Sequence, residues 1–237
     1  MIEKNVFQTW KTHNLPSKIE KILAKNRKIN PEFNFYLYTD EQLHDFIKSN
    51  FDQEIFNGFK KLNHPVAKAD FWRYLILYKY GGVYLDIDSK FNKPILSFIN
   101  DNDEAVVSAE TNPGNYVQWA LFYKKNHPIL IRTIELILEN LNMGLYKNDI
   151  ERLTGPKVYA KSIEEFYKIS KNKNLDWSTI NNNTDFKFEF EVGGTIHKVR
   201  MFGVDYLNNL QFKHKHSHLL YEKSEHWLSS QAKKDVY

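Results

Sequence analysis

A chain of 237 residues is long enough to bury a sizeable core, and one α/β domain commonly fills this length. Its composition, 42% hydrophobic and 26% charged, is ordinary for a globular protein and excludes wholesale disorder and a fibrous chain. The absence of cysteine excludes disulfides and thiolate metal sites, so a metal ion must be held by oxygen or nitrogen. Because the formal net charge is only +4 and the lysines are dispersed, we expect no nucleic-acid partner.

The sequence carries no signal for a membrane or for secretion. No stretch approaches the roughly 20 consecutive apolar residues that span a bilayer, and the first ten residues lack the apolar run of a signal peptide. We therefore expect no transmembrane segment, and a location in the cytoplasm or peripherally at a membrane. The aromatic content of 15% is high. Most of these rings will fill the core, although sugar and nucleobase sites also stack ligands on aromatic side chains.

The first part of the chain predicts two strand–helix units. Residues 6–10 read as a short strand, followed by a helix that starts near Pro16-Ser17. Residues 33–38 alternate aromatic and polar side chains and form a second strand, after which Thr39-Asp40 opens another helix. Alternation of this kind favours a mostly parallel sheet with helices on its faces.

A third helix is expected to start at His64-Pro65 and to end at Gly81-Gly82, because glycine supplies the left-handed conformation that closes many helices. It leads directly into the apolar strand VYLDID. Periodicity predicts three further elements, which are strands at 104–109 and 116–123 and a helix at 127–141.

The last third of the chain predicts a hairpin. Strict alternation in FKFEFEV, then Gly193-Gly194, then HKVRMF indicates two antiparallel strands that form an appendage. Gly155-Pro156 is expected to break the chain, and residues 231–237 to form a loosely held tail. With no repeat or domain boundary visible, we expect one domain over residues 1–237.

The Asp86-Ile87-Asp88 triplet is the main candidate for chemistry. If the strand extends through it, Tyr84, Asp86 and Asp88 share one face, because side chains alternate along a strand. A hard divalent cation is the simplest partner for two carboxylates in a buried strand, and it would orient and neutralise a diphosphate. Taken alone, such a triplet is more often a solvated strand end. Its place after an apolar strand of an α/β sheet favours a ligand site.

The preceding helix adds Asp70 and Arg73, which lie on one face because they are three residues apart. An intrahelical ion pair is the simple interpretation. Alternatively, the planar guanidinium of Arg73 could hold a phosphate or sugar hydroxyls, with Asp70 accepting hydrogen bonds from the sugar.

The run ADFWRYLILYKYGGVYLDIDS, residues 69–89, resembles the signature of the sugar-binding Asp-X-Asp glycosyltransferases, glycosyltransferase family 32. This is the group around the yeast initiating mannosyltransferase and the large clostridial glucosylating toxins. Its first strand often reads His-Gln-Thr-Trp-Lys, where this chain has Phe7-Gln8-Thr9-Trp10-Lys11, so Phe7 departs from the pattern.

The resemblance implies a GT-A type, Rossmann-like mixed sheet flanked by helices, and transfer with retention of anomeric configuration. It also implies a nucleotide diphosphate sugar as donor and Mn²⁺ or Mg²⁺ as cofactor. Carried over by position, the donor and metal residues would be Gln8, Trp10, Asp70, Arg73, Tyr84, Asp86 and Asp88. Trp10 would stack on the base, Asp70 and Arg73 would hold the sugar, and Asp88 would ligate the metal together with Asp86. Trp10 and Tyr84 could equally be core aromatics.

The second half of the chain resembles the family more loosely. Family members usually end with a His and a Ser-Trp that complete the metal and donor site. We expect His218 and Trp227 in these roles, although His214, His216, Ser224 and His226 offer other registers. Weaker resemblances lie at Gln118-Trp119, Asn126-His127-Pro128 and Thr154-Gly155-Pro156.

The expected function is therefore metal-dependent transfer of a hexose-type sugar to a glycan, lipid-linked sugar or protein acceptor, as in polysaccharide biosynthesis. Residues 1–110 would bind the nucleotide sugar and residues 111–230 the acceptor. Three alternatives are a haloacid dehalogenase-like phosphatase with Asp86 as nucleophile, a glycoside hydrolase, and a non-catalytic protein that binds sugar nucleotides. Two carboxylates so close together lie on one side of a ligand rather than flanking it, which argues against the hydrolase.

Overall fold

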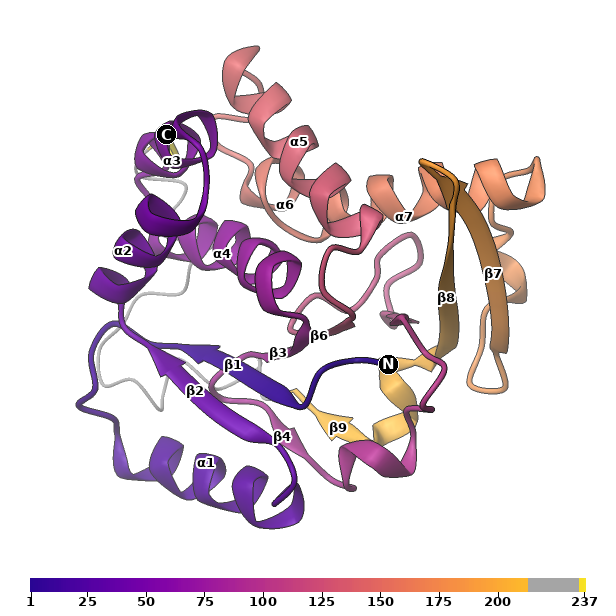
Figure 1. Ribbon diagram of the computed structural model, residues 1–237, viewed down its shortest axis with the longest axis horizontal. Helices are drawn as coiled ribbons and strands as arrows, with labels where there is room; N and C mark the ends of the chain where they lie inside the picture. The colour runs from indigo at the N-terminus through magenta and orange to yellow at the C-terminus, as the bar shows by residue number, and fades with distance from the viewer. Residues whose placement is uncertain (213–234) are drawn as a thin grey trace.

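A computed structural model describes residues 1–212 and 235–237 of the chain. Its centre is a seven-stranded sheet in the order β2-β1-β3-β6-β5-β8-β7, beside which β4 (Lys90–Phe91) and β9 (Leu210–Gln211) form a small antiparallel sheet (Figure 1). The strands of the large sheet are β1 (Asn5–Thr9), β2 (Asn34–Tyr38), β3 (Gly82–Leu85), β5 (Ala105–Ala109), β6 (Ala120–Tyr123), β7 (Asp185–Val192) and β8 (Thr195–Val204).

Helices cover both faces of the large sheet. The helix α1 and the small sheet lie on one face, and the other helices lie on the opposite face (Figure 1). The helices are α1 (Ser17–Ile29), α2 (Asp40–Asn50), α3 (Gln53–Lys61), α4 (Pro65–Tyr80), α5 (Pro128–Asn142), α6 (Ile150–Leu153) and α7 (Pro156–Lys171), with 3₁₀ turns at η1 (Ile95–Ser97), η2 (Trp177–Thr179) and η3 (Asp205–Asn208).

The sheet is mixed, as expected. Strands β2, β1 and β3 are parallel, β6 runs against β3 and β5, and β8 runs parallel to β5. The carboxyl ends of β1, β3, β5 and β8 therefore share one edge, where ligands of α/β sheets bind.

Local sequence signals delimit α4, the helix that leads into the candidate site. Pro65 occupies its first turn, where no intrahelical N–H bond is lost, and His64 Nδ1 accepts a hydrogen bond from Val66 N–H at 3.2 Å. The helix ends at Tyr80 and is capped by Gly81 with φ of 64°, and Gly82 follows with φ of 107°. A Cβ on Gly82 would lie 2.5 Å from the backbone oxygen of Asn5, so only glycine fits against β1.

The core requires α4 to be apolar on nearly every side. Its residues Phe71, Trp72 and residues 74–77 are completely buried between the sheet and α2, α3 and α5. A helix without a polar face is stable only inside a protein. The packing of these apolar side chains fixes the orientation of α4. Asp70 and Arg73, on the same helix, are therefore held in the interior of the protein.

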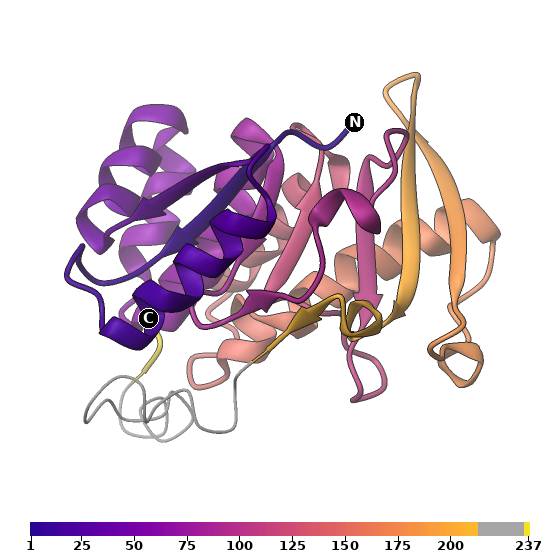
Figure 2. The ribbon, with the colours of Figure 1, turned by 90° about the horizontal axis from the view of Figure 1, so that it is seen from below.

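Several elements differ from the sequence-based expectations. The helices α3, α6 and α7 were not predicted, and Pro156 begins α7 rather than breaking the chain. The expected hairpin is present as β7 and β8, but β8 pairs with β5, so the hairpin extends the main sheet instead of forming an appendage (Figure 2). Strand β6 is shorter than expected and starts at Ala120.

Residues 235–237 are packed against the rest of the protein. For these residues the expectation of a loosely held tail is wrong. The side chain of Val236 is completely buried, its N–H donates to Lys147 O at 2.7 Å, and its carbonyl accepts from Asn63 N–H at 2.6 Å. These contacts join the terminus to the loops after α3 and after α5.

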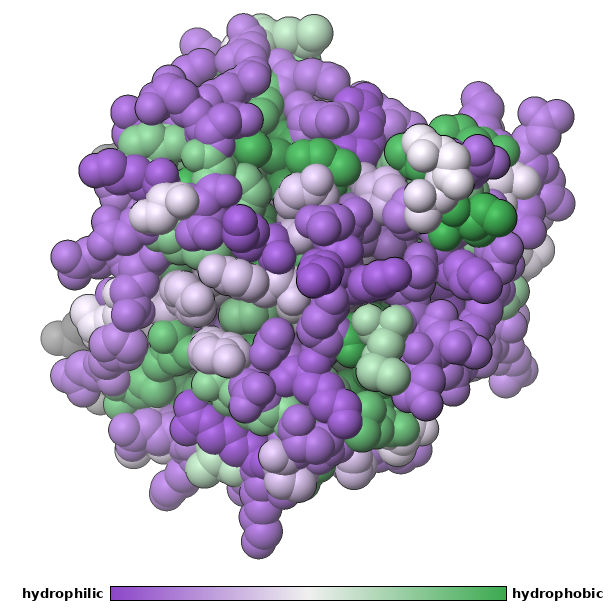
Figure 3. Space-filling view, viewed as in Figure 1, coloured by the Kyte–Doolittle hydropathy of each residue, from purple (hydrophilic) through white to green (hydrophobic). Residues whose placement is uncertain are grey.

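The surface in the view of Figure 3 is largely hydrophilic, with hydrophobic side chains at the tip of the hairpin, where Val192 and Ile196 are 42% and 57% exposed. Within residues 1–212 and 235–237, no helix combines the length and the apolar character that crossing a bilayer requires.

Candidate active site

The Asp-X-Asp triplet lies in a turn at the end of β3, not within the strand. The strand ends at Leu85, and the turn is closed by Ser89 N–H donating to Asp86 O at 2.9 Å. Asp86 N–H donates to Trp119 O at 2.8 Å, which ties the turn to the segment before β6. The condition under which alternation would align Asp88 with Asp86 is therefore not met, because alternation stops where the extended backbone stops.

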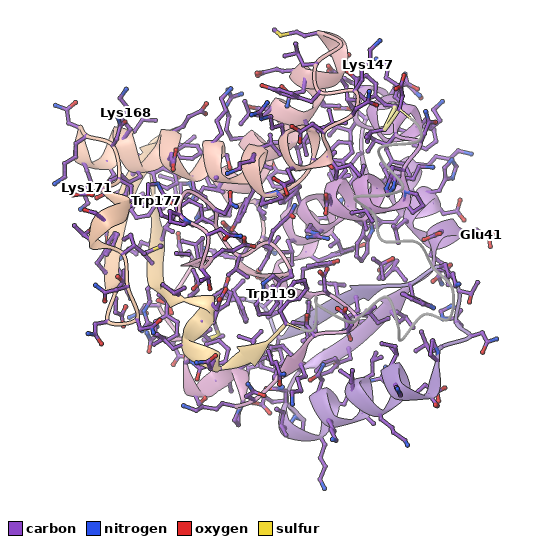
Figure 4. The ribbon with its side chains drawn as sticks, turned by 180° about the vertical axis from the view of Figure 1, so that it is seen from behind. Glu41, Trp119, Lys147, Lys168, Lys171 and Trp177 are labelled. Atoms are coloured by element: carbon purple, nitrogen blue, oxygen red, sulfur yellow. The ribbon has the colours of Figure 1, made fainter. Side chains whose placement is uncertain are left out.

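Trp119 supports this turn from the small-sheet side of the molecule. Its indole ring stacks on Phe212 with ring centroids 5.1 Å apart, and its side chain is 6% exposed. Figure 4 shows Trp119 near the middle of the molecule as seen from behind, away from Trp177 and Lys147.

Arg73 is the centre of the site. One terminal nitrogen of its guanidinium lies 2.9 Å from Asp70 Oδ1 and 3.4 Å from Asp86 Oδ1, and the other donates to Gln118 O at 3.0 Å. The guanidinium carbon lies 4.5 Å from the centroid of the Tyr84 ring, in cation–π contact. The side chain is buried, so charge compensation by both carboxylates is necessary to keep it there.

Asp86 is the most exposed member of this group, with 27% of its side chain accessible. Its Oδ1 accepts a hydrogen bond from the Tyr84 hydroxyl at 2.7 Å as well as from Arg73. Within the described part of the chain, Oδ2 takes part in none of the observed hydrogen bonds. Burial raises the pKa of the Asp86 carboxyl, while Arg73 and the Tyr84 hydroxyl oppose that rise.

Asp70 connects the site to the junction between α6 and α7. Its Oδ2 accepts a hydrogen bond from the hydroxyl of Thr154, which is completely buried, at 3.2 Å. The carbonyl of Thr154 accepts from the Tyr74 hydroxyl and from Gln118 Nε2, both at 3.2 Å. Three segments distant in sequence, namely α4, the residue Gln118 and the residue Thr154, thus fix the carboxylate that pairs with Arg73.

Asp88 is 6% exposed and lies two residues further along the turn. Ile87, between the two carboxylates, packs against Ile19, Ile22 and Leu23 of α1 and anchors the turn. Two aspartates presented by one anchored turn provide hard oxygen ligands, the type that Mg²⁺ and Mn²⁺ prefer.

Gln8 in β1 and Trp10 just after it, both predicted to contact the donor, lie at the edge of the sheet that carries the Asp-X-Asp turn. Their surroundings differ from each other. Trp10 follows the strand, donates its N–H to Tyr38 O at 3.0 Å, and packs against the apolar cluster under α1. Gln8 is 1% exposed, and its Nε2 finds no hydrogen-bond partner among residues 1–212 and 235–237. Because Phe7 pairs with Tyr84 in register, Gln8 points to the face opposite Tyr84.

His218 and Trp227, the expected C-terminal contributors, lie outside the described residues, as do His214, His216, Ser224 and His226. Sequence reasoning gave no donor-site role to Thr154, Gln118 or Tyr74. Gln118 and Thr154 lie in two stretches that resemble the family, and this resemblance could have indicated that they belong to the site. Nothing in the sequence distinguished Tyr74 from the other aromatic residues of its helix.

The fold and the site define an α/β protein of the GT-A type with an Asp-X-Asp turn at the carboxyl edge of its sheet. Among solved structures, the PaToxG glycosyltransferase superposes with a TM-score of 0.61 at 23% identity, over 72% of each chain. This similarity supports the fold.

Sequence comparisons define the family. Residues 16–106 match the model of the glycosyltransferase sugar-binding region containing the DXD motif. An uncharacterized glycosyltransferase of Acanthamoeba polyphaga mimivirus is 30% identical over 71% of this chain and 67% of its own length. The chain therefore belongs to the family of glycosyltransferases with a sugar-binding DXD region.

A second relative is the initiation-specific alpha-1,6-mannosyltransferase of Candida albicans, which is 28% identical over 75% of this chain. The chain spans 58% of the length of that protein.

Proposed function

We propose that the protein transfers a hexose, with mannose as the first candidate, from a nucleoside diphosphate sugar to an acceptor hydroxyl. One observation carries the proposal: the buried guanidinium of Arg73 is shared between Asp70 on α4 and Asp86 on the turn, beneath the exposed part of Asp86. This arrangement places polar groups suited to sugar hydroxyls directly beside a carboxylate suited to a cation. Mannose is proposed because the Candida relative is a mannosyltransferase.

The roles of the residues follow from their positions. Asp70 would accept hydrogen bonds from hydroxyls of the donor sugar, with its orientation fixed by Thr154 and Arg73. Arg73 would contact the sugar and the diphosphate, and Tyr84 would lie against the nucleotide while its hydroxyl orients Asp86. Trp10, at the end of β1, would stack on the base, with Gln8 supporting the same end of the strand.

The carboxylates of Asp86 and Asp88 are hard oxygen ligands of the kind that suits a divalent cation, Mn²⁺ or Mg²⁺, and we propose His218, which lies outside the described residues, as a further nitrogen ligand of this cation. Asp86 retains an oxygen for it, since the hydrogen bonds of Tyr84 and Arg73 both go to Oδ1. When bound, the cation would neutralise charge on the leaving diphosphate. Retention of anomeric configuration is proposed from family membership alone, and Trp227 is proposed to cover the donor.

The acceptor is proposed to enter at the carboxyl edge of the sheet, beside the junction of α6 and α7 that holds Asp70. Residues 1–110 contribute the nucleotide-sugar half and residues 111–230 the acceptor half of one catalytic domain. A glycan, a lipid-linked sugar or a protein could present the hydroxyl group. We propose action in the cytoplasm or peripherally at a membrane, in the synthesis of a polysaccharide.

A screen of nucleotide sugars tests this function. The purified chain is incubated with Mn²⁺ and with GDP-mannose, UDP-glucose or related donors, and release of the nucleoside diphosphate is measured with and without simple glycosides. We expect one donor to be consumed, and consumed faster with an acceptor. Hydrolysis of aryl phosphates dependent on Asp86, without use of any nucleotide sugar, would support the phosphatase instead. Donor binding without turnover would indicate a non-catalytic binding protein.

A further inference from the structure

Three ligand-type side chains gather at the edge of the sheet opposite the Asp-X-Asp turn. Glu104, His127 and His197 each place one carboxylate oxygen or ring nitrogen within 4.8 Å of the others. They come from three separate elements: the residue before β5, the N-cap of α5, and the first half of β8. Side-chain exposure is 17% for Glu104 and 19% for His197, and His127 is 1% exposed.

The position of this cluster separates it from the donor site. Tyr123 of β6 pairs with both Gly82, at the start of β3, and Ala105, at the start of β5. Glu104 is therefore level with the beginning of β3, whereas Asp86 follows its end. A ligand of the cluster would lie on the opposite side of the sheet edge from the proposed donor.

His127 has a buried ring nitrogen, Nε2, without a well-formed hydrogen bond. Its Nε2 makes no hydrogen bond with any residue in the described ranges, and the ring is enclosed by Tyr123 and His197, whose ring centroids lie 5.2 and 5.6 Å away. Burial lowers the pKa of this imidazole to about 3, helped by His197 and opposed by the backbone of Lys198. An imidazole nitrogen is a common ligand of metal ions, and a buried polar atom is usually satisfied by a partner.

Glu104 supplies a carboxylate that faces both histidines and is also contacted by lysines. Its Oε1 lies 3.1 Å from Lys124 Nζ, and its Oε2 accepts from Lys198 N–H at 3.1 Å and lies 3.8 Å from His197 Nδ1. Burial raises the pKa of the Glu104 carboxyl, but the contacts with Lys124, the Lys198 backbone and His197 outweigh it and hold the pKa below its ordinary value. Each carboxylate oxygen keeps a second lone pair, and Lys124, 45% exposed, can move into solvent.

We propose that Glu104, His127 and His197 form a zinc site that clamps the β7–β8 hairpin to the start of α5. Two imidazoles and one carboxylate are a set of protein ligands that holds Zn²⁺ with a fourth position left for water. The absence of cysteine leaves histidine as the main source of the borderline-soft ligands that zinc prefers. The ion would join the first half of β8, the start of β5 and α5 through one centre.

The proton arrangement of His127 limits the affinity of this site. Its Nδ1 accepts a hydrogen bond from Ile129 N–H at 3.3 Å as the cap of α5. Zinc on Nε2 would move the ring proton to Nδ1, so this long cap bond would be exchanged for the metal bond. We therefore expect a micromolar site rather than the much tighter sites of zinc fingers.

Zinc binding to the full chain tests the proposal independently of activity. Other histidines can bind zinc, so the background protein carries His214→Gln, His216→Gln and His218→Gln, and Mg²⁺ is present in excess to fill carboxylate sites. Calorimetry with ZnCl₂ should give one equivalent bound. The visible spectrum with Co²⁺ should show tetrahedral coordination.

Two variants remove a ligand at partly exposed positions, where folding is least disturbed. In the same background, His197→Gln and Glu104→Gln should each weaken zinc binding at least tenfold and abolish the tetrahedral Co²⁺ spectrum. The control His44→Gln alters an exposed histidine beside Asp45. It should change neither the zinc affinity nor the Co²⁺ spectrum. Absence of binding in the background protein, unchanged binding in His197→Gln, or an equal loss in His44→Gln would each overturn the zinc site.

Discussion

The hydroxyl of Thr154 donates a hydrogen bond to Oδ2 of Asp70 at 3.2 Å, across 84 positions of sequence. The contact ties the α6–α7 junction to the carboxylate that pairs with Arg73. The position of Asp70 therefore depends on correct formation of the α6–α7 junction.

Replacing Thr154 by valine should reduce kcat/KM for the donor roughly thirtyfold, because one hydrogen bond to a buried carboxylate is lost at about 2 kcal/mol. Initial rates of donor consumption measure the change. The control Thr133→Val removes an equally buried hydroxyl that bonds Ile129 O and Ser162 on α5 and α7. It should lower the melting temperature without changing kcat/KM. Equal kinetics in both variants would contradict a role for Thr154 at the site.

Arg73→Lys should lower kcat/KM about a hundredfold, near 3 kcal/mol, although the charge is kept. One ammonium group cannot reach Asp70, Asp86 and Gln118 O together, whereas the planar guanidinium does. The matched control is Arg200→Lys, since Arg200 is also largely buried and pairs with Asp103 and Asp185 away from the site. That variant should lose stability and keep donor kinetics. A fully active Arg73→Lys protein would contradict the proposed contact.

Tyr84→Phe isolates the hydroxyl that orients Asp86. The ring under Arg73 remains, and only the 2.7 Å hydrogen bond is lost. A hydrogen bond to a carboxylate contributes about 2 kcal/mol, so we expect roughly a thirtyfold loss of kcat/KM. Tyr123→Phe, which breaks the hydroxyl pair with Tyr159, serves as the control and should affect the melting temperature alone. If Tyr123→Phe impaired the donor kinetics as strongly, the effect would be structural.

Glu110 provides a pH-dependent prediction about stability. Burial, with Asp205 and Glu151 nearby, raises the pKa of its carboxyl to about 7 from an ordinary 4.5. Between these values the folded protein binds more protons than the unfolded chain, so this group lowers stability as the pH rises from 4.5 to 7. Glu110→Gln should thus raise the melting temperature increasingly over this range and level off above it. A difference independent of pH would refute the assignment.

The sequence predicted the framework of the site well, for physical reasons. Pro65 and Gly81 delimit a helix by their backbone preferences, and the apolar run after Gly82 can only be a buried strand. Asp70 and Arg73, three residues apart on that helix, lie together as expected. Such features depend on neighbours in sequence, so local rules suffice.

Features that depend on distant contacts were missed. The sequence left open whether the strand reaches Asp88; it ends at Leu85, and a turn closed by Ser89 N–H and Asp86 O follows. Thr154 approaches Asp70 only because α6 and α7 pack on α4 and α5. The hairpin was predicted correctly, yet its pairing with β5 depends on register between segments about 90 residues apart, which periodicity cannot specify.

The most direct test of the donor site is Mn²⁺-dependent consumption of a nucleotide sugar by the wild-type protein and by Asp88→Asn. This substitution keeps the shape of the side chain and removes the charge that would hold the cation. Asp101→Asn, in an exposed turn, is the control. We predict Mn²⁺-dependent release of nucleoside diphosphate by the wild-type and control proteins, and none by Asp88→Asn at an unchanged melting temperature. Equal turnover by Asp88→Asn would contradict a donor site built on the Asp-X-Asp turn.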